Sequence, residues 1–385
     1  MLSEKSRPVI EATLPLVGSR IGEITADFYN RLFTAHPGLL DGLFSRSNQR
    51  SGEQQKALAG SIAAFASHLL TNPDSLPEKV LSRIAHKHAS LGITEEQYDV
   101  VYKHLFAAIA ADLADVITPE IAEAWTEVYW LMADALIKLE KDLYASQAND
   151  RMWMPWRVVA KEPAGKDSIT FTLEPADETP VTEAKPGQYV SVKVTLADGL
   201  RQVRQYSLSG DAGTSRIFTT KLNDGGEVSA VLHADVEPGD ILEISNPYGE
   251  ITLKDGEGPV ILASAGIGCT PTASILRSLA ESGTDREVIV LHAEKAMDNW
   301  ALSGQMTQDA SRIDAKLELW LETPHAGAKE GFMSLREMDL PADASLYLCG
   351  PLPFMKSIRD EAIDAGIPAT RIHYEVFGPD VWLAS

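Results

Sequence analysis

The sequence is poor in cysteine: its 385 residues include only two, Cys269 and Cys349. Two cysteines are too few for a disulfide framework, so we expect the chain to reside in a reducing cytoplasm. Basic residues are also scarce, with 34 Lys and Arg against 55 Asp and Glu, giving a net charge of -21. Because no basic run is present to displace counter-ions, we expect neither a nucleic-acid partner nor binding to an anionic membrane.

Long hydrophobic runs are missing as well. The longest charge-free apolar stretch, 260–276, is interrupted by Gly266, Gly268 and Pro271, and therefore predicts a strand, a loop and a helix start rather than a membrane span. The first residues have no apolar segment typical of a secretory signal. Apolar residues make up 44% of the chain, an ordinary globular composition, and the length favours two or three domains.

Apolar residues in the first third recur at helical spacing. This pattern predicts helices over residues 9–33, about 54–70, 80–91, 95–113 and 119–143. Thr94 and Gln97 form a capping box before the fourth helix, and Pro119 opens the fifth. No alternating, strand-like run precedes Trp153, so the sequence predicts an all-α domain over residues 1–147.

His88 is the candidate ligand of this domain. It shares one face of its predicted helix with Leu81 and Ile84, which places the imidazole in line with an apolar stripe. Such an imidazole can hold a haem iron, although a core histidine bonded to a backbone carbonyl fits the same pattern. Tyr29 and Gln54 could turn inward from two helices, and Glu140 adjoins the apolar seam of the last helix. Each also fits an ordinary role: Tyr29 as a boundary residue, Gln54 as part of a helix start and Glu140 as a solvated charge. Phe44, in the loop, could lie flat on a porphyrin.

Short β-rich runs replace the helices after Trp153. They cover 157–160, 168–173, 189–196, 204–208, 216–220 and 241–245, with turn clusters between them. This spacing predicts a small antiparallel barrel over residues 152–256, with 152–155 as a linker. The run RQYS, 204–207, puts a guanidinium, an aromatic ring and a hydroxyl on one strand. This run could bind a diphosphate and a flat ring of a ligand, or it could be an ordinary edge strand.

Residues 257–385 show a βαβ pattern. Strands are predicted over 259–265, 287–293 and 345–350, with helices over 273–282 and 354–366. Gly266 and Gly268 would let backbone N–H groups approach a pyrophosphate, although the full Gly-x-Gly-x-x-Gly fingerprint is absent. Glu294 follows the second strand at the ribose position with no arginine beside it, which favours NADH over NADPH.

Together these motifs resemble the flavohaemoglobins, the bacterial and yeast nitric oxide dioxygenases, over almost the whole chain. The helical part carries DFYNRLF, FSRSNQRSGEQQKAL, KHASLGITEEQY and the acid of IKLEKDLY. The remainder resembles the ferredoxin-NADP reductase family through PGQYV, RQYS, GIGCTP, CGPLPFM and YEVFGP. The resemblance implies an all-α globin domain (1–147), then an antiparallel β-barrel FAD domain (152–256), then an α/β parallel-sheet NAD(P)-binding domain (257–385).

The resemblance also implies residue roles. His88 would be the proximal ligand of haem b iron. The other haem-side residues would be Tyr29 and Gln54 on the distal side, Tyr98 and Glu140 in a relay behind His88, and Phe44 and Lys87 beside the pocket. FAD would be bound by Tyr189, Arg204, Gln205, Tyr206, Ser207, Gly226, Ser229, Glu375, Val376, Phe377, Gly378 and Pro379. NADH or NADPH would be bound by Gly266, Ile267, Gly268, Cys269, Thr270, Pro271, Cys349, Gly350 and Pro351.

The implied activity is conversion of nitric oxide and dioxygen to nitrate, with electrons passing from NAD(P)H through FAD to haem and no obligate protein partner. Two alternatives stay open: a flavin reductase or oxidase acting on ferric iron, quinones or peroxides, and a gas-sensing or oxygen-binding globin. The complete reductase portion argues against the second. For Lys87 and Glu375 a solvated surface charge fits equally well. The chain departs from the family pattern in a longer loop before Phe44, at Cys269, and at Val376, where cysteine is common.

Overall fold

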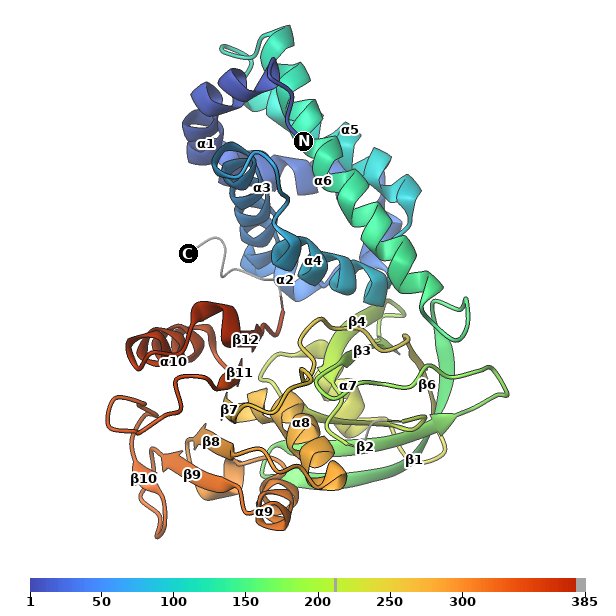
Figure 1. The fold of residues 1–385 in the computed structure, drawn as a ribbon. Coiled ribbons are helices and arrows are strands. Elements are labelled where there is room, and N and C mark those ends of the chain that lie inside the picture. The colour runs from blue at the N-terminus through green and yellow to red at the C-terminus, as the bar shows by residue number, and fades with distance from the viewer. Residues whose placement is uncertain (211–212, 379–385) are drawn as a thin grey trace. The chain divides into compact units, whose positions relative to one another are not determined.

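The computed structural model describes residues 1–210 and 213–378, which form two compact units (Figure 1). The first unit contains residues 1–152, the short segment 197–203 and Gly378. The second unit contains residues 153–196 and 204–377. Within the described part of the chain, no helix combines the length and apolar character needed to cross a membrane.

The first unit is helical, as its periodicity predicted. Its elements are α1 (Ser6–Ala35), a 3-10 turn (Pro37–Leu40), α2 (Arg46–Ser51), α3 (Glu53–Thr71), α4 (Glu78–Leu91), α5 (Glu95–Asp112) and α6 (Pro119–Ala145). Apolar residues spaced three or four apart on the long helices meet in one core that includes Phe28, Phe65 and Trp125. The capping box of Thr94 and Gln97 is confirmed. The short α2 was not expected, because six residues carry too little periodic signal.

Helix α4 presents His88. Leu81 and Ala85 are buried on the inner face, and α4 packs against α6. Gly92 ends the helix at φ +76°, a left-handed conformation that costs glycine little because it has no Cβ. The sequence therefore determines both the exposed face of α4 and the point where it stops, one turn beyond His88.

The second unit begins with an antiparallel barrel. Its elements are β1 (Met154–Gly165), β2 (Ser168–Pro175), β3 (Tyr189–Thr195), β4 (Arg201–Ser207), β5 (Arg216–Lys221), α7 (Glu227–Ala234) and β6 (Ile241–Ile244). The strand order is β4-β3-β6-β1-β2-β5, and an antiparallel bridge between Leu208 and Phe218 joins its two ends. Trp156, Phe171 and Phe218 fill the interior. The antiparallel architecture is confirmed.

The predicted linker 152–155 is wrong in its second half. Met154 and Pro155 lie in β1, opposite Ile244 and Glu243 of β6. Met154 is only 1% exposed. Burial of this side chain in the barrel core extends the strand to residues that look like a linker in sequence.

A parallel sheet follows. It contains β7 (Val260–Ala265), α8 (Cys269–Ser282), β8 (Val288–Glu294), α9 (Ser303–Arg312), β9 (Lys316–Leu321), β10 (Lys329–Glu330), β11 (Ser345–Cys349), α10 (Leu352–Asp364) and β12 (Ile372–Glu375). The strand order is β10-β9-β8-β7-β11-β12, with α8 and α9 on one face and α10 on the other (Figure 1). This is the predicted α/β fold, and neighbouring strands are parallel.

Helix α8 begins at Cys269, four residues before the predicted start at Ala273. The sequence predicts Pro271 in the loop before this helix. It lies instead in the first turn of α8, where its missing N–H costs nothing because that N–H would have no helical partner. The turn Gly266–Gly268 is a 3-10 helix that leads directly into α8.

Candidate functional site

His88, Tyr98 and Glu140 form a hydrogen-bonded cluster. The Tyr98 hydroxyl donates to Glu140 Oε1 over 2.6 Å, and the same oxygen is 2.8 Å from His88 Nδ1. The Tyr98 hydroxyl is also 3.0 Å from His88 Nδ1. Glu140 is 2% exposed, so its carboxylate depends on these partners rather than on water. Burial, then the charge of Glu140, raises the pKa of Tyr98, which therefore keeps its proton.

This cluster fixes how His88 can bind a metal. A carboxylate only accepts hydrogen bonds, so His88 donates its Nδ1–H to Glu140 and Nε2 keeps the lone pair. The His88 side chain is 31% exposed although Ala85 and Ala89, on the same helix, are buried. A partly exposed imidazole oriented by a carboxylate at Nδ1 is the kind of donor that a haem iron takes through Nε2. His88, Tyr98 and Glu140 therefore fit the proximal side of a haem.

Tyr29 and Gln54 come together from α1 and α3. Tyr29 is 5% exposed, and its hydroxyl is hydrogen-bonded by the Gln54 side chain. Burial raises the pKa of Tyr29, so the hydroxyl remains a donor. The Phe44 ring meets Tyr29 edge-on, with centroids 6.0 Å apart. The structure thus brings together Tyr29 and Gln54, predicted for the distal side, and Phe44, predicted beside the pocket.

Phe33 belongs to the same aromatic group and was missed. Its ring is stacked with Tyr29 at 5.7 Å between centroids and meets Phe44 edge-on at 5.2 Å. The available signal was its spacing, since Tyr29 and Phe33 are four residues apart on one helix and so share a face. Lys87, also predicted beside this pocket, has its Nζ 3.4 Å from the Gly378 carbonyl.

Strand β4 carries the predicted flavin residues. Tyr206 stacks on Phe218 with centroids 5.3 Å apart, and Gln205 donates to Ser191 Oγ over 2.9 Å. Burial lowers the pKa of Arg204. Ser207 is 4% exposed, and its buried Oγ has no hydrogen-bond partner. A buried hydroxyl without a partner costs free energy, so this oxygen fits a ligand atom such as one on the edge of a flavin ring.

The other predicted barrel residues lie on two further elements. Tyr189, at the start of β3, pairs with Tyr248 through two backbone hydrogen bonds of 2.8 and 2.9 Å. Gly226 precedes α7, and a Cβ there would lie 2.7 Å from Ser229 Oγ, which explains the glycine. The N-terminus of α7 carries partial positive charge that suits a phosphate.

The C-terminal strand β12 places Glu375 beside Cys349. The two residues are paired across β11 and β12, and Glu375 is 8% exposed. Burial, followed by the charge of Glu375, holds the pKa of Cys349 well above its usual value. Val376 and Gly378 follow, and Phe377 is 45% exposed. Pro379, also predicted to bind FAD, lies outside the described residues.

The glycine turn after β7 is sterically tight. A Cβ on Gly268 would collide with the Cys349 carbonyl, so only glycine fits there. Gly266 adopts φ +56°, again a conformation that favours glycine. Thr270 Oγ1 donates to the Ile267 carbonyl over 3.0 Å and fixes the turn. The backbone can therefore approach a pyrophosphate closely at the start of α8, as the residues at 266–271 predicted.

The other half of this predicted site lies at the end of β11. Gly350 and Pro351 connect β11 to α10, and Pro351 stands at the cap of that helix. A Cβ on Gly350 would be 2.8 Å from the Phe354 ring. Cys269, at the start of α8, is fully buried, donates to the Ala301 carbonyl over 3.4 Å, and has its pKa raised to about 12 by burial.

Glu294 is the last residue of β8, and one of its carboxylate oxygens has no hydrogen-bond partner. Its Oε1 accepts from Lys295 N over 2.9 Å, while its buried Oε2 has no partner and lies 3.9 Å from the position that a Cβ on Gly266 would take. Burial raises the pKa of Glu294. Behind it, His292 is fully buried, 2.9 Å from Ser264 Oγ and stacked on Trp300. The His292 cluster was not foreseen, because nothing local marks a histidine inside an apolar strand.

Comparison with known proteins gives matches to both parts of the chain. The globin family model matches residues 26–136, and the oxidoreductase FAD-binding domain model matches residues 155–253. Flavohemoproteins of Chromobacterium violaceum and Rhizobium meliloti are 40% and 39% identical, over 98% and 99% of this chain and 98% and 100% of their own.

Solved structures agree. A flavohemoglobin from Malassezia yamatoensis, solved with bound FAD and heme, has a TM-score of 0.94 and 44% identity over 98% of this chain and 100% of its own. The FAD/NAD-binding domain of the nitric oxide dioxygenase from Vibrio cholerae has a TM-score of 0.57 and 32% identity, covering 60% of this chain and 100% of its own.

Proposed function

The chain belongs to the flavohaemoprotein family, and from this premise we propose that it is a nitric oxide dioxygenase, an enzyme that converts nitric oxide and dioxygen to nitrate. It is an NAD(P)H-dependent oxidoreductase that takes haem and FAD. Nitrate formation needs one electron for each nitric oxide and dioxygen, so each NADH supports two turnovers. The name of the Vibrio cholerae relative supports this activity.

The proposal is supported by two separate hydrogen-bonded sets of residues in the helical unit. Glu140 and Tyr98 hold His88 from behind, while Tyr29 and Gln54 form a second hydrogen-bonded pair. A proximal carboxylate makes the imidazole a stronger electron donor, as oxygen chemistry requires and simple reversible gas storage does not. Tyr29 offers a protonated donor that can stabilise negative charge developing on a bound diatomic ligand.

When bound, FAD would accept two electrons as hydride and release them singly, and haem would supply the iron at which the gases react. The chain's own contribution is orientation. Ser207, whose buried hydroxyl has no partner, would donate to the flavin ring, and Arg204 would hold the diphosphate. Gly266 and Gly268 would let the backbone approach the nucleotide pyrophosphate, and Glu294 Oε2 would accept from the ribose hydroxyls. The domain boundaries at 147, 152 and 257, these residue roles and a cytoplasmic location remain predictions.

The test is nitric oxide consumption in air by the purified full-length protein, followed with an electrode while nitrate and NADH are quantified. We expect rapid loss of nitric oxide that needs NADH and yields two nitrates per NADH. His88→Ala should abolish that loss but preserve NADH-driven reduction of a flavin acceptor such as ferricyanide. This variant separates haem chemistry from reductase chemistry.

Two outcomes would contradict the proposal. NADH oxidation without faster loss of nitric oxide would identify a reductase or oxidase with another acceptor. Reversible dioxygen binding with no NADH-dependent turnover would identify a sensor or storage globin.

A further inference from the structure

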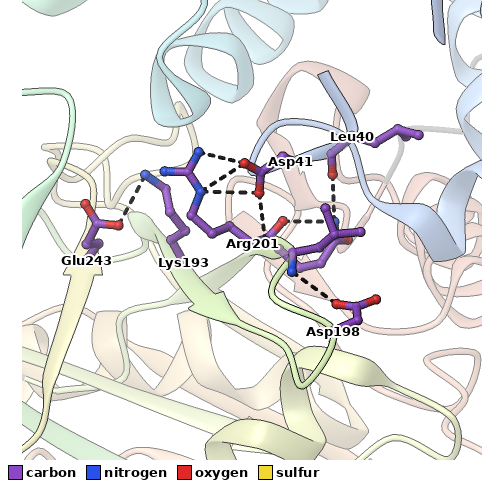
Figure 2. Close-up of polar contacts among 8 residues, drawn as sticks. Leu40, Asp41, Lys193, Asp198, Arg201 and Glu243 are labelled. Atoms are coloured by element: carbon purple, nitrogen blue, oxygen red, sulfur yellow. Dashed lines mark hydrogen bonds and ion pairs between the residues drawn. The ribbon is translucent and has the colours of Figure 1, made fainter. Parts of the chain in front are cut away.

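The segment 197–203, which ends the turn before β4 and begins that strand, belongs by its contacts to the helical unit. Figure 2 shows how it is held. The Arg201 side chain forms a two-pronged ion pair with Asp41, with Nη2 2.8 Å from Oδ2 and Nε 3.2 Å from Oδ1. The Arg201 backbone N–H donates to Asp41 Oδ1, and its carbonyl accepts from Gly42 N, both over 2.8 Å. Side chain and backbone thus bind the same loop.

Gln202 adds a buried contact to this loop. Its side chain is 0% exposed, and its amide reaches three points of the loop. Oε1 accepts from Arg46 N over 3.2 Å, and Nε2 donates to the Leu40 carbonyl over 3.0 Å, with the Phe44 carbonyl at 3.5 Å. A buried amide satisfied in this way fixes the backbone it contacts, since breaking one bond leaves polar groups without water.

The loop 40–46 holds a residue of the candidate distal pocket. The Phe44 ring packs edge-on against Tyr29 and Phe33, at 6.0 and 5.2 Å. The next residue, Ser45, caps α2 through Asn48 N. Helix α2 leads through Gly52 to the start of α3, where Gln54 hydrogen-bonds Tyr29. Two contacts of Tyr29, those with Phe44 and Gln54, thus come from this loop and from the helices that follow it.

We propose that Gln202 and Arg201 are positioning residues of the distal pocket: they hold Phe44 against Tyr29 and so set how fast a ligand leaves the haem iron. This inference rests on the proposed function, because it takes Tyr29 as the distal donor. It has a consequence for the chain as a whole. Strand β4 begins with Arg201 and Gln202 and continues to Arg204, Tyr206 and Ser207. The same strand thus carries the residues proposed to support the distal pocket and those predicted to contact the flavin.

The test uses Gln202→Leu, which removes the amide but keeps the approximate size of the side chain. Its matched control is Glu243→Gln, which removes one charge from the ion pair between Glu243 and Lys193. This pair is 3.5 Å long and is also drawn in Figure 2. No described interaction joins it to Gln202 or Phe44. Three properties of the full-length haem- and FAD-loaded protein are measured: dioxygen dissociation from the ferrous form, the C–O stretching band of its carbon monoxide complex, and hydrogen exchange of amides 40–48.

For Gln202→Leu we expect dioxygen to dissociate about two- to thirtyfold faster, the C–O band to broaden or shift, and amides 40–48 to exchange faster. The KM for dioxygen should rise by more than kcat falls. The control should match the wild type in all of these. Because the effect passes through Phe44, Gln202→Leu should change the dissociation rate little in a Phe44→Ala background, a non-additivity that a merely structural loss would not produce.

Faster hydrogen exchange of amides 40–48 with an unchanged dioxygen dissociation rate and C–O band would overturn the inference. The contacts of Arg201 and Gln202 with the loop would then be structural only. Full additivity with Phe44→Ala would also overturn it. If Gln202→Leu does not fold, Asp41→Asn replaces it, since the half-exposed Asp41–Arg201 pair contributes little to stability. A wild type that forms no carbon monoxide complex would instead defeat the proposed function, so the two failures are distinct.

Discussion

Glu140 and His88 are joined by a 2.8 Å contact between Oε1 and Nδ1, and Tyr98 donates to the same oxygen over 2.6 Å. The Tyr98 hydroxyl therefore competes with the imidazole for the charge on Glu140. Two substitutions at these positions should shift the haem reduction potential in opposite directions. One removes the negative charge of the acceptor Glu140, and the other removes the Tyr98 hydroxyl that competes with His88 for it.

Glu140→Gln replaces the carboxylate by a neutral amide and makes His88 a weaker donor. We expect the reduction potential of the haem to rise and nitric oxide turnover to fall by about ten- to a hundredfold. Tyr98→Phe leaves the carboxylate to His88 alone, so the potential should fall. Potentiometric titration of both variants checks the signs. Shifts in the same direction would refute the competition for Glu140.

Tyr29→Phe removes the distal hydroxyl without emptying the space. We expect dioxygen to leave about ten- to a hundredfold faster, as measured by stopped-flow, because a donor to a charged ligand is lost. Phe33→Leu, which removes a ring stacked on Tyr29 but no donor, is the control and should change the rate less. Since burial raises the pKa of Tyr29, the wild-type rate should also stay flat from about pH 6 to about pH 10.

Ser207→Ala should separate stability from catalysis. The Ser207 hydroxyl is buried without a partner, so its removal should leave the Tm of the cofactor-free protein unchanged or slightly raised. If Ser207 binds the flavin as proposed, reduction of bound FAD by NADH should slow by about tenfold in anaerobic stopped-flow, because the variant lacks that hydrogen bond. A lower Tm with normal flavin reduction would show that the hydroxyl serves the fold instead.

Glu294→Gln tests nucleotide selection. The unpartnered Oε2 near Gly266 can accept from the ribose hydroxyls of NADH and repels the extra phosphate of NADPH. We expect the ratio of kcat/KM for NADH over NADPH to fall by about tenfold, chiefly through a lower KM for NADPH. An unchanged ratio would place the ribose away from Glu294.

His292 should make stability depend on pH. Burial lowers the pKa of His292 to about 3 from an ordinary value of 6.5. Between these values the unfolded chain binds a proton that the folded chain does not. Stability is therefore complete above about pH 6.5 and falls by about 1.4 kcal/mol per pH unit below it.

The comparison variant is His292→Gln, which keeps a polar partner for Ser264 Oγ. Melting the full chain at about pH 7.5 and about pH 5.5 should show a larger loss of Tm in the wild type than in this variant. Equal losses would mean that His292 is protonated in the folded state.

Local features whose signals are close in sequence were predicted well. The helix that carries His88 was predicted from the spacing of Leu81, Ile84 and His88, and the capping box of Thr94 and Gln97 lies within four residues. Gln202 and His292 were not foreseen. Gln202 contacts residues about 160 positions away, and the partners of His292 lie on other elements, so no local spacing reports either contact. Tertiary burial likewise moved the start of β1 into a segment that reads as a linker.

The state of the two cysteines has a consequence for chemical durability. Cys269 and Cys349 are buried free thiols, and burial raises the pKa of both. Nitrosating and oxidising agents attack the thiolate rather than the thiol, and they need access to it. The proposed nitric oxide dioxygenase would work among such agents, and its two buried cysteines offer them no accessible thiolate, so we expect neither thiol to be modified over many turnovers.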